Sequence, residues 1–292
     1  MLELIKAKGN TYYIDNINNI GICKLNEKEV FVIDTGLNSE MGRRIRDIVA
    51  RNGWTVKFVI NTHSHADHNG GNRFLQEEYN CKIYSSHGEI ASSNVPFFNT
   101  TMVYGGYPPK SIYGDFYLSE QSEVTDINEL TLPCGYEVIK LKGHSIDMIG
   151  IKTPDDVYFI ADTILSEKSL LRFGISYNYD IKSYLETLDY LKTLNGKLFI
   201  PAHAKPYEDI AEIVELNRKK ILEIIENILN FIQEKKTFDE ILAHLFEIYN
   251  LKMDFKQHTM QSCTLKSYLS YLYNDDKIEQ IVENNKLYFK RV

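Results

Sequence analysis

Residues 61–71 read NTHSHADHNGG, a stretch dense in potential metal ligands. It places His63, His65, Asp67 and His68 within six positions, although the chain of 292 residues holds only eight histidines. Imidazole and carboxylate groups without thiolate suit Zn²⁺, and also Fe and Mn. On an extended segment His63 and His65 point to the same side, and Asp67 and His68 then turn toward a second position. The stretch predicts half of a metal site.

The segments around this motif predict a layered α/β scaffold. The apolar run 55–60, TVKFVI, directly precedes the motif and predicts a buried strand. The motif therefore lies at the C-terminal end of a strand, where loops carry chemistry. Other patterns predict a helix over 39–53 with Ser39 as its N-cap, a helix over 73–80, and strands at 10–17, 18–25, 29–36 and 82–86.

Three later segments supply the missing half of the site. His144, Asp162 and His203 each follow an apolar strand pattern, at 136–143, 149–162 and 196–203. With the first motif they make five imidazoles and two carboxylates. A carboxylate such as Asp162 can bridge two cations, and two cations can share one hydroxide and clamp the attacking and leaving oxygens. The other three histidines lack this context and are predicted to be structural: His87, His244 and His258.

Composition places the chain among soluble globular proteins. It is 43% hydrophobic and 25% charged, and no apolar run approaches the roughly 20 residues of a membrane span. The N-terminus has neither the apolar core nor the cleavage site of a signal peptide. Four cysteines without CxxC spacing argue against a disulfide framework, so we expect a cytoplasmic protein without membrane association. The net charge of −7 disfavours a dedicated nucleic-acid binder, although bound divalent cations would invert the local field.

The composition shifts after about residue 207. Three helices are predicted, at 208–233, 237–250 and 258–276, and a hairpin then turns at Asn284 and Asn285. Thr237 and Glu240 form a capping-box pattern at the second helix. Three helices and a hairpin predict a winged-helix-like module at 207–292, separate from a catalytic domain at 1–206. Its third helix offers only Lys266 as a cation, which favours packing or substrate shaping over nucleic-acid binding.

These motifs resemble those of the metallo-β-lactamase superfamily. THSHADHNGG is similar to its HxHxDH signature, and GHSIDMIG, ADT and PAH look like its later motifs, where the family commonly has GHT, GD and GH. Ser145, Ala161 and Ala202 depart from the usual residues without removing a ligand. The resemblance implies a mixed α/β (α+β) fold, a four-layer αβ/βα sandwich with the metals at one edge, over residues 1 to about 206.

The resemblance also implies a role for each candidate ligand. His63, His65 and His144 would hold the first metal. The second metal would be held by Asp67, His68 and His203, with Asp162 as the bridge. Asp34 matches a supporting acidic position, and an Asx turn is an equal alternative. A full set of seven is found in glyoxalase II, ribonuclease Z and the lactonases. The inserted domain of the nucleic-acid-processing branch is absent, since only about 40 residues separate Asp162 from His203.

The leading functional prediction is a dinuclear hydrolase with two divalent cations. Zn²⁺ is expected, with Fe and Mn left open. A metal-bridging hydroxide would attack an ester, thioester, lactone or related acyl substrate, and Asp67 would act catalytically by orienting it or relaying its proton. The C-terminal module does not resemble the thioester-binding domain of glyoxalase II, which weakens a glutathione-thioester substrate. Tyr104, Tyr107 and Tyr113, in the irregular tract 96–121, and the stretch 170–174 are candidates for the pocket wall.

Three other functions stay open at this point. An RNA endonuclease would use the same site on phosphorus, and the C-terminal module resembles that of lactamase-like endoribonucleases. A mononuclear iron sulfur oxygenase would bind metal only at the first-metal and bridging positions. A non-catalytic binding module is the weakest alternative, because a complete set of seven metal ligands is not expected in a protein that does not use it. The expected partner is a small-molecule substrate, with RNA and a homodimer left open.

Overall fold

Two β-sheets face each other across an apolar interior in the computed structural model, which describes residues 2–114 and 118–292. The first sheet has seven strands in chain order, antiparallel from the first to the fourth and parallel from the fourth to the seventh. Its strands are β1 (Leu4–Lys8), β2 (Thr11–Ile14), β3 (Ile20–Lys24), β4 (Glu29–Ile33), β5 (Thr55–Ile60), β6 (Lys82–Ser85) and β7 (Val124–Asp126).

The second sheet has the strand order β11-β10-β9-β8. β10 pairs in parallel with β11 and antiparallel with β9, and β9 pairs antiparallel with β8. The segment 149–162 therefore divides into two strands, which turn at Asp156 with a φ of 58°. The strands are β8 (Glu137–Lys140), β9 (Ile149–Lys152), β10 (Val157–Ala161) and β11 (Leu198–Pro201).

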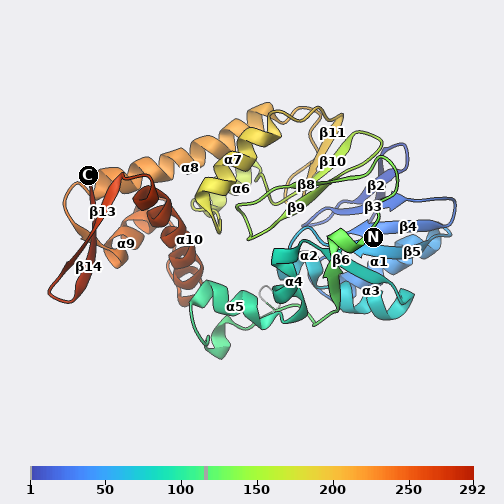
Figure 1. Ribbon diagram of the computed structural model, residues 1–292, viewed down its shortest axis with the longest axis horizontal. Coiled ribbons are helices and arrows are strands. Elements are labelled where there is room, and N and C mark those ends of the chain that lie inside the picture. The colour runs from blue at the N-terminus through green and yellow to red at the C-terminus, as the bar shows by residue number, and fades with distance from the viewer. Residues whose placement is uncertain (1, 115–117) are drawn as a thin grey trace.

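Helices cover the outer face of each sheet and complete four layers. Between the sheets, Phe31 and Phe58 of the first pack in one cluster with Phe159 of the second. On the far side of the first sheet lie α1 (Ser39–Arg51) and α3 (Asn72–Tyr79), and on the far side of the second lies α7 (Ile181–Leu191) (Figure 1). The predicted αβ/βα sandwich is confirmed.

The strand ends place the candidate ligands at one edge. β5 ends three residues before His63, and Asp162 directly follows β10. β11 runs parallel to β10, so His203, two residues beyond β11, emerges at the same edge. His144 follows β8. Asp67 and His68 belong to the single helical turn α2 (Ala66–Asn69).

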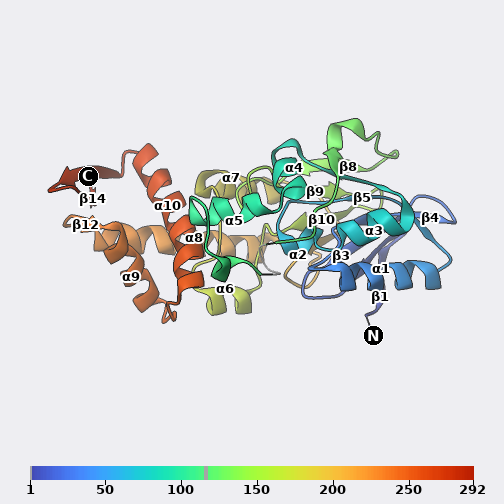
Figure 2. The ribbon, with the colours of Figure 1, turned by 90° about the horizontal axis from the view of Figure 1, so that it is seen from below.

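The C-terminal region lies at the opposite end of the molecule's long axis from the first sheet (Figures 1 and 2). The long helix α8 leads into it, and its own three-stranded sheet has the order β12-β14-β13. The predicted capping box at Thr237 and the turn at Asn284 and Asn285 are both present. Its elements are α8 (Ala211–Phe231), β12 (Lys236–Thr237), α9 (Phe238–Ile248), α10 (Phe255–Asn274), β13 (Ile278–Glu283) and β14 (Lys286–Arg291).

This region shares one apolar cluster with the second sheet. The cluster runs from Ile160 of β10 through Leu188 of α7 and Ile228 of α8 to Tyr268 of α10. α8 packs against α7 of the sandwich and against α9 of the C-terminal region. Among the helices of the described ranges, none combines the length and the hydropathy that a bilayer span requires.

The tract 96–121 is more ordered than predicted. It contains α5 (Phe97–Tyr104), which ends at Gly105 with a left-handed φ of 83°, and the 3-10 turn η1 (Lys110–Ile112). The helices α4 (His87–Asn94) and α6 (Glu167–Phe173) and the strands β1 and β7 were also not predicted. These elements are short, and α4 and α5 carry no clear apolar stripe. Tyr117, which shares this tyrosine-rich tract, lies outside the described residues.

Two helix starts differ from the prediction. Asn38, not Ser39, caps α1, and its side chain accepts a hydrogen bond from Met41 N. α10 begins at Phe255 and is capped by Asp254, so it carries Lys256 as well as the predicted Lys266. The prediction of Lys266 as the sole cation of this helix is therefore wrong.

Candidate metal centre

The histidines proposed for the first metal converge in the structure. His63 Nε2 lies 2.9 Å from His65 Nδ1, and His144 Nε2 lies 3.0 Å from the same His65 atom. The three ligand atoms fall within 4.8 Å of one another, close enough to hold one ion. Nitrogen atoms of neutral imidazoles at this spacing form the three-histidine set that leaves a zinc coordination position open.

The residues proposed for the second metal form an adjacent group. His203 Nε2 lies 3.1 Å from Asp67 Oδ2, and His68 Nε2 lies 3.7 Å from the same oxygen. Their ligand atoms also fall within 4.8 Å of one another. Asp67 and His68 lie on the short helix α2, and His63 and His65 precede it. The two groups adjoin at His63 and His68, whose ring centroids are 4.0 Å apart and whose ligand atoms also group with Asp162.

Asp162 lies between the two groups. Its Oδ2 is 3.3 Å from His144 Nε2 and 3.2 Å from His203 Nε2, while its Oδ1 is 3.1 Å from His68 Nε2. Within the described residues, Asp162 Oδ1 and His68 Nε2 are buried and make no hydrogen bond of good geometry. Buried polar atoms normally have partners. These two orphaned atoms, in a donor set of imidazole and carboxylate, fit divalent cations.

Asp34 supports the second group from behind. Its Oδ2 lies 2.8 Å from His68 Nδ1 and accepts a hydrogen bond from Thr62 Oγ1, while its Oδ1 accepts one from Thr62 N. The contact leaves His68 Nε2 facing the cluster, as expected of a carboxylate that orients a ligating histidine. His203 is oriented in the same way by the carbonyl of Ile17, 2.9 Å from its Nδ1.

Glu89 supports the first group and was not predicted. This buried carboxylate on α4 accepts hydrogen bonds from Ser64 N and Ser64 Oγ with one oxygen, and from Ser145 Oγ and Asp147 N with the other. Ser64 separates His63 from His65, and Ser145 follows His144. One carboxylate thus ties together both loops that present the first-metal histidines. The segment around Glu89 shows no pattern that would have revealed this role.

The three histidines of the first group are held in their neutral form. Burial, aided by the nearby His68 and His65, lowers the pKa of His63 well below its ordinary value. Burial likewise lowers the pKa of His65, and lowers that of His144 to about 4. Neutral imidazole is the form that binds a metal.

In the metal-free protein, the two histidines of the second group are held in their protonated form. Burial opposes charge on His203, but Asp162 and Asp67 outweigh it and raise the pKa of His203 to about 10. The pKa of His68 is raised too, because Asp162 and Asp67 outweigh its burial. Burial disfavours ionised Asp67, yet His68 and His203 lower the pKa of Asp67 to about 2. Cations in this group would replace protons on the two histidines.

Close backbone packing shapes the ligand loops. A Cβ on Gly70 would lie 2.0 Å from Leu37 O, so only glycine fits where the loop after α2 meets the β4–α1 turn. Gly143 has a φ of 123° and sits against the backbone of Tyr184 on α7, just before His144. Ala161 has a φ of 47° directly before Asp162. This left-handed conformation gives a physical reason for the glycine that relatives commonly carry there.

An aromatic ring borders the first group, but not one of the predicted tyrosines. Tyr177, in the loop after α6, has its ring centroid 5.6 Å from that of His65 and 5.7 Å from that of His144. Tyr104 instead contacts Phe255. Tyr107 and Tyr113 both contact Phe97.

The remaining histidines lie apart from the cluster, as predicted. His87 is exposed at the start of α4 and pairs with Asp126 at 2.9 Å. His244 stacks on Phe231 with a centroid distance of 4.0 Å. His258 lies in the first turn of α10.

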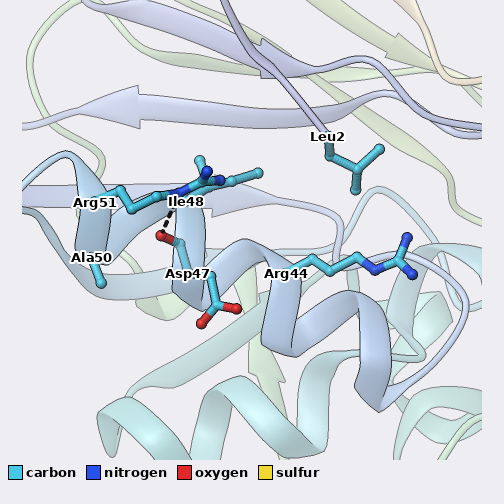
Figure 3. A pocket seen from close by; sticks show the side chains of 6 residues that line it. All are labelled: Leu2, Arg44, Asp47, Ile48, Ala50 and Arg51. Carbon is cyan, nitrogen blue, oxygen red and sulfur yellow. Dashed lines mark hydrogen bonds between the residues drawn. The ribbon is translucent and has the colours of Figure 1, made fainter.

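Two surface hollows also lie apart from the seven candidate ligands. One of about 780 Å³ runs along α1 beside Leu2 (Figure 3). Its lining includes Arg44 and Arg51. The other, of about 770 Å³, lies between α7 and α10. Its lining mixes charges of both signs, among them Lys182, Asp189 and Lys266.

The arrangement of ligands on this sandwich agrees with a family comparison. The model of the metallo-beta-lactamase superfamily matches residues 9–203. The chain belongs to this superfamily. The match spans all seven candidate ligands and stops before the C-terminal module, which it does not describe. Membership of this superfamily, together with the clustered ligand atoms, implies that the protein binds divalent metal.

Solved structures show that the fold extends over the whole chain. A beta-lactamase domain protein from Burkholderia ambifaria superposes with a TM-score of 0.76 at 16% identity, covering 99% of this chain and 94% of that one. A metallo-beta-lactamase family protein from Thermus thermophilus superposes with a TM-score of 0.68 at 18% identity, covering 100% and 98%. At these identities the likeness concerns the fold alone.

Curated relatives match over a shorter part. A hydroxyacylglutathione hydrolase from Nitrobacter hamburgensis is 28% identical over 123 residues, which are 42% of this chain and 39% of that protein. One from Rhodopseudomonas palustris is 29% identical over 119 residues, or 40% and 38%. The chain thus spans about two-fifths of the length of the curated relatives it matches.

Proposed function

We propose that this superfamily member is a dinuclear metal-dependent hydrolase that cleaves an acyl substrate, a thioester or an ester. The observation that carries the proposal is the convergence of the seven candidate ligands, with Asp162 between two groups of three. Among the described residues, Asp162 Oδ1 and His68 Nε2 are buried there without a hydrogen-bond partner. We assign His63, His65 and His144 to one cation and Asp67, His68 and His203 to the other, with Asp162 shared.

Two bound divalent cations, which we expect to be Zn²⁺, would lower the pKa of water toward ~7 and polarise the substrate carbonyl. The chain's own residues then hold the reacting groups. Asp67 is the carboxylate among the seven candidate ligands other than the bridging Asp162, and its Oδ2 faces His203 at 3.1 Å. Asn18 donates a hydrogen bond to the backbone carbonyl of Asp67 and so fixes the turn that presents it. We assign to Asp67 the orientation of the attacking water and the acceptance of its proton.

An acyl substrate is favoured over RNA by two observations. The curated relatives are named for hydrolysis of a hydroxyacyl-glutathione thioester. The net charge of −7 opposes a polyanion, and Lys266 of α10 lies over the ring of Phe238 at 6.0 Å instead of forming part of a basic row. We also propose that residues 1–206 are the catalytic domain, in keeping with the 9–203 match, and that 207–292 form a winged-helix-like module with a role other than RNA binding.

The test measures metal content and turnover together. Mass spectrometry of the purified protein is expected to find two zinc ions per chain. The protein is then assayed against hydroxyacyl-glutathione thioesters, aryl esters and lactones, and against single-stranded RNA with and without chelator. Asp67→Asn is expected to reduce kcat by about 10²- to 10⁴-fold while binding of the first metal persists.

The matched control is His87→Ala, since His87 is exposed and pairs with Asp126 away from the cluster. It should keep full activity and both metals, whereas His63→Ala should lose the first metal. Undiminished turnover in His63→Ala and Asp67→Asn would refute the proposal. One iron per chain with no hydrolysis would favour the sulfur oxygenase, and chelator-sensitive cleavage of RNA alone would favour the nuclease.

A further inference from the structure

Tyr177 stands beside the first-metal histidines without belonging to them. Its ring meets His65 and His144 nearly edge-on, with interplanar angles of 67° and 81°. Tyr177 is half-buried, so part of this residue is accessible to solvent. A ring in this position would border a molecule that approaches the first-metal histidines.

The C-terminal helix α10 holds the loop that carries Tyr177. It makes two hydrogen bonds to this loop and to the first residue of α7: Gln261 Nε2 donates to Ile175 O at 3.1 Å, and Ile181 N donates to Ser267 Oγ at 3.1 Å. The Cys263 thiol of α10 also lies beside the Tyr177 hydroxyl, close enough for each group to influence the pKa of the other. α10 therefore holds this loop in place, and the position of Tyr177 depends on the C-terminal module.

A second helix, α5, contacts both α10 and the metal motif. α5 packs against α10, and the two lie side by side in both views (Figures 1 and 2). Asn99 of α5 donates to Ser64 O, inside the metal motif, at 2.7 Å. The Cys263 thiol contacts Met102 O of α5 at 3.9 Å. α5 thus links α10, which holds the loop of Tyr177, to the segment that carries His63 and His65.

Large apolar side chains are exposed beside both metal groups. Ile146, two residues after His144, is 42% exposed, and Ile17, whose carbonyl bonds His203, is 85% exposed. Ligand sites are lined mostly by apolar and aromatic side chains, with a few polar groups that fix orientation. Together with the Tyr177 ring, they suit an uncharged, apolar group on the substrate next to the scissile bond.

We propose that Tyr177 contacts the acyl group of the substrate, that α10 fixes Tyr177 through Cys263, and that the acyl group selected is apolar. The inference rests on the proposed hydrolase function and adds to it the substrate class and a role for the C-terminal module. Tyr177 is then a specificity-determining residue, and Cys263 is a positioning residue that acts through it.

The experiment uses the zinc-loaded full chain and p-nitrophenyl acetate, butyrate and hexanoate, which share one leaving group. For the wild type, kcat/KM is expected to rise along the series, by up to about four-fold for each methylene that becomes buried. Tyr177→Ala should cost hexanoate about ten-fold more than acetate, mainly through KM. Cys263→Ala should also reduce the rise of kcat/KM with acyl chain length. Zinc content should stay at the wild-type value in both variants.

A double-mutant cycle separates positioning from general packing. In a Tyr177→Phe background the hydroxyl is gone but the ring remains, so Cys263→Ala should have no further effect on chain-length preference. Cys134→Ala, at an exposed cysteine, is the matched control and should behave as wild type. A flat series in the wild type, or additive effects of Tyr177→Phe and Cys263→Ala, would overturn the inference while leaving the hydrolase intact. Failure to hydrolyse any ester or thioester would instead overturn the proposed function.

Discussion

Glu89 Oε1 accepts a hydrogen bond of 2.7 Å from Ser145 Oγ, and this bond joins helix α4 to the loop of His144. The other oxygen of Glu89 accepts from Ser64 Oγ at 2.6 Å, within the loop of His63 and His65. Two loops that are 81 residues apart in sequence at Ser64 and Ser145 are therefore fixed by one side chain. The geometry of the first-metal histidines depends on a residue that touches none of their rings.

Glu89→Gln is expected to weaken zinc binding at the first group. The amide keeps one acceptor oxygen and places an NH₂ group where serine hydroxyls now donate, so one of the two loops is released. Loss of a supporting contact of this kind costs about 10- to 100-fold in metal affinity. Competition with a chromophoric chelator would measure the change. Glu247→Gln, at an exposed position of α9, is the control, and equal zinc affinity in both variants would contradict the supporting role.

Asp34→Asn is expected to act on the second group instead. Asp34 has a left-handed φ of 61°, which asparagine also tolerates, so the backbone should survive the change. The lost charge weakens the 2.8 Å contact with His68 Nδ1 and leaves the orientation of that imidazole less fixed. Metal content after dialysis should fall from two toward one, with the first metal retained. Loss of both metals at equal rates would show that the two groups are not supported independently.

The seven candidate ligands could be predicted from sequence because five of them are histidines, of which the chain holds only eight, and because each follows an apolar strand. His144, Asp162 and His203 come from three strands that end at one edge of one sheet, so their meeting follows from the layered fold. The metal motif could be divided into two groups because His63 and His65 lie two residues apart on an extended segment, whereas Asp67 and His68 lie in the helical turn α2 that follows.

Glu89 and Tyr177 could not be found in this way. Their roles arise where elements distant in sequence meet, at α4 with two ligand loops and at α10 with the loop after α6. No periodic pattern in the local sequence indicates such a contact between distant elements. The short helices α4 and α5 escaped prediction for a related reason, since they are held by side chains such as Glu89 and Asn99 and not by an apolar stripe.

Added zinc is expected to stabilise the fold. Asp162 and His68 are buried against each other, and a cation that satisfies both binds the native state only. At a free zinc concentration of 100 times Kd the gain is about 2.7 kcal/mol. For a chain of this size that corresponds to a rise in Tm of roughly 4 °C. Calorimetric scans with zinc and with chelator would measure it. The control is His68→Ala, in which the second-metal part of the rise should vanish; an unchanged Tm in the wild type would contradict a buried metal site.

The two metals are expected to differ in the protons they displace. In the metal-free protein the pKa of His203 is about 10 and that of His68 is raised, so both are protonated at neutral pH. The pKa values of His63, His65 and His144 are lowered, the last to about 4, so those three are neutral. A metal binds only the neutral imidazole. Binding at the second group should therefore release up to about two protons, and binding at the first group close to none.

The pH dependence follows from the same difference. As pH falls from 8 toward 5, protons compete for His68 and His203 but not for the first group, so the second metal should dissociate first. The first should persist to lower pH, because burial lowers the pKa values of His63, His65 and His144, the last to about 4. Titration calorimetry in buffers of different ionisation enthalpy counts the protons of each phase, and metal analysis after dialysis gives the order of loss. Equal proton release in both phases, or simultaneous loss of both metals, would show that Asp67 and Asp162 do not hold the two histidines of the second group in their charged form.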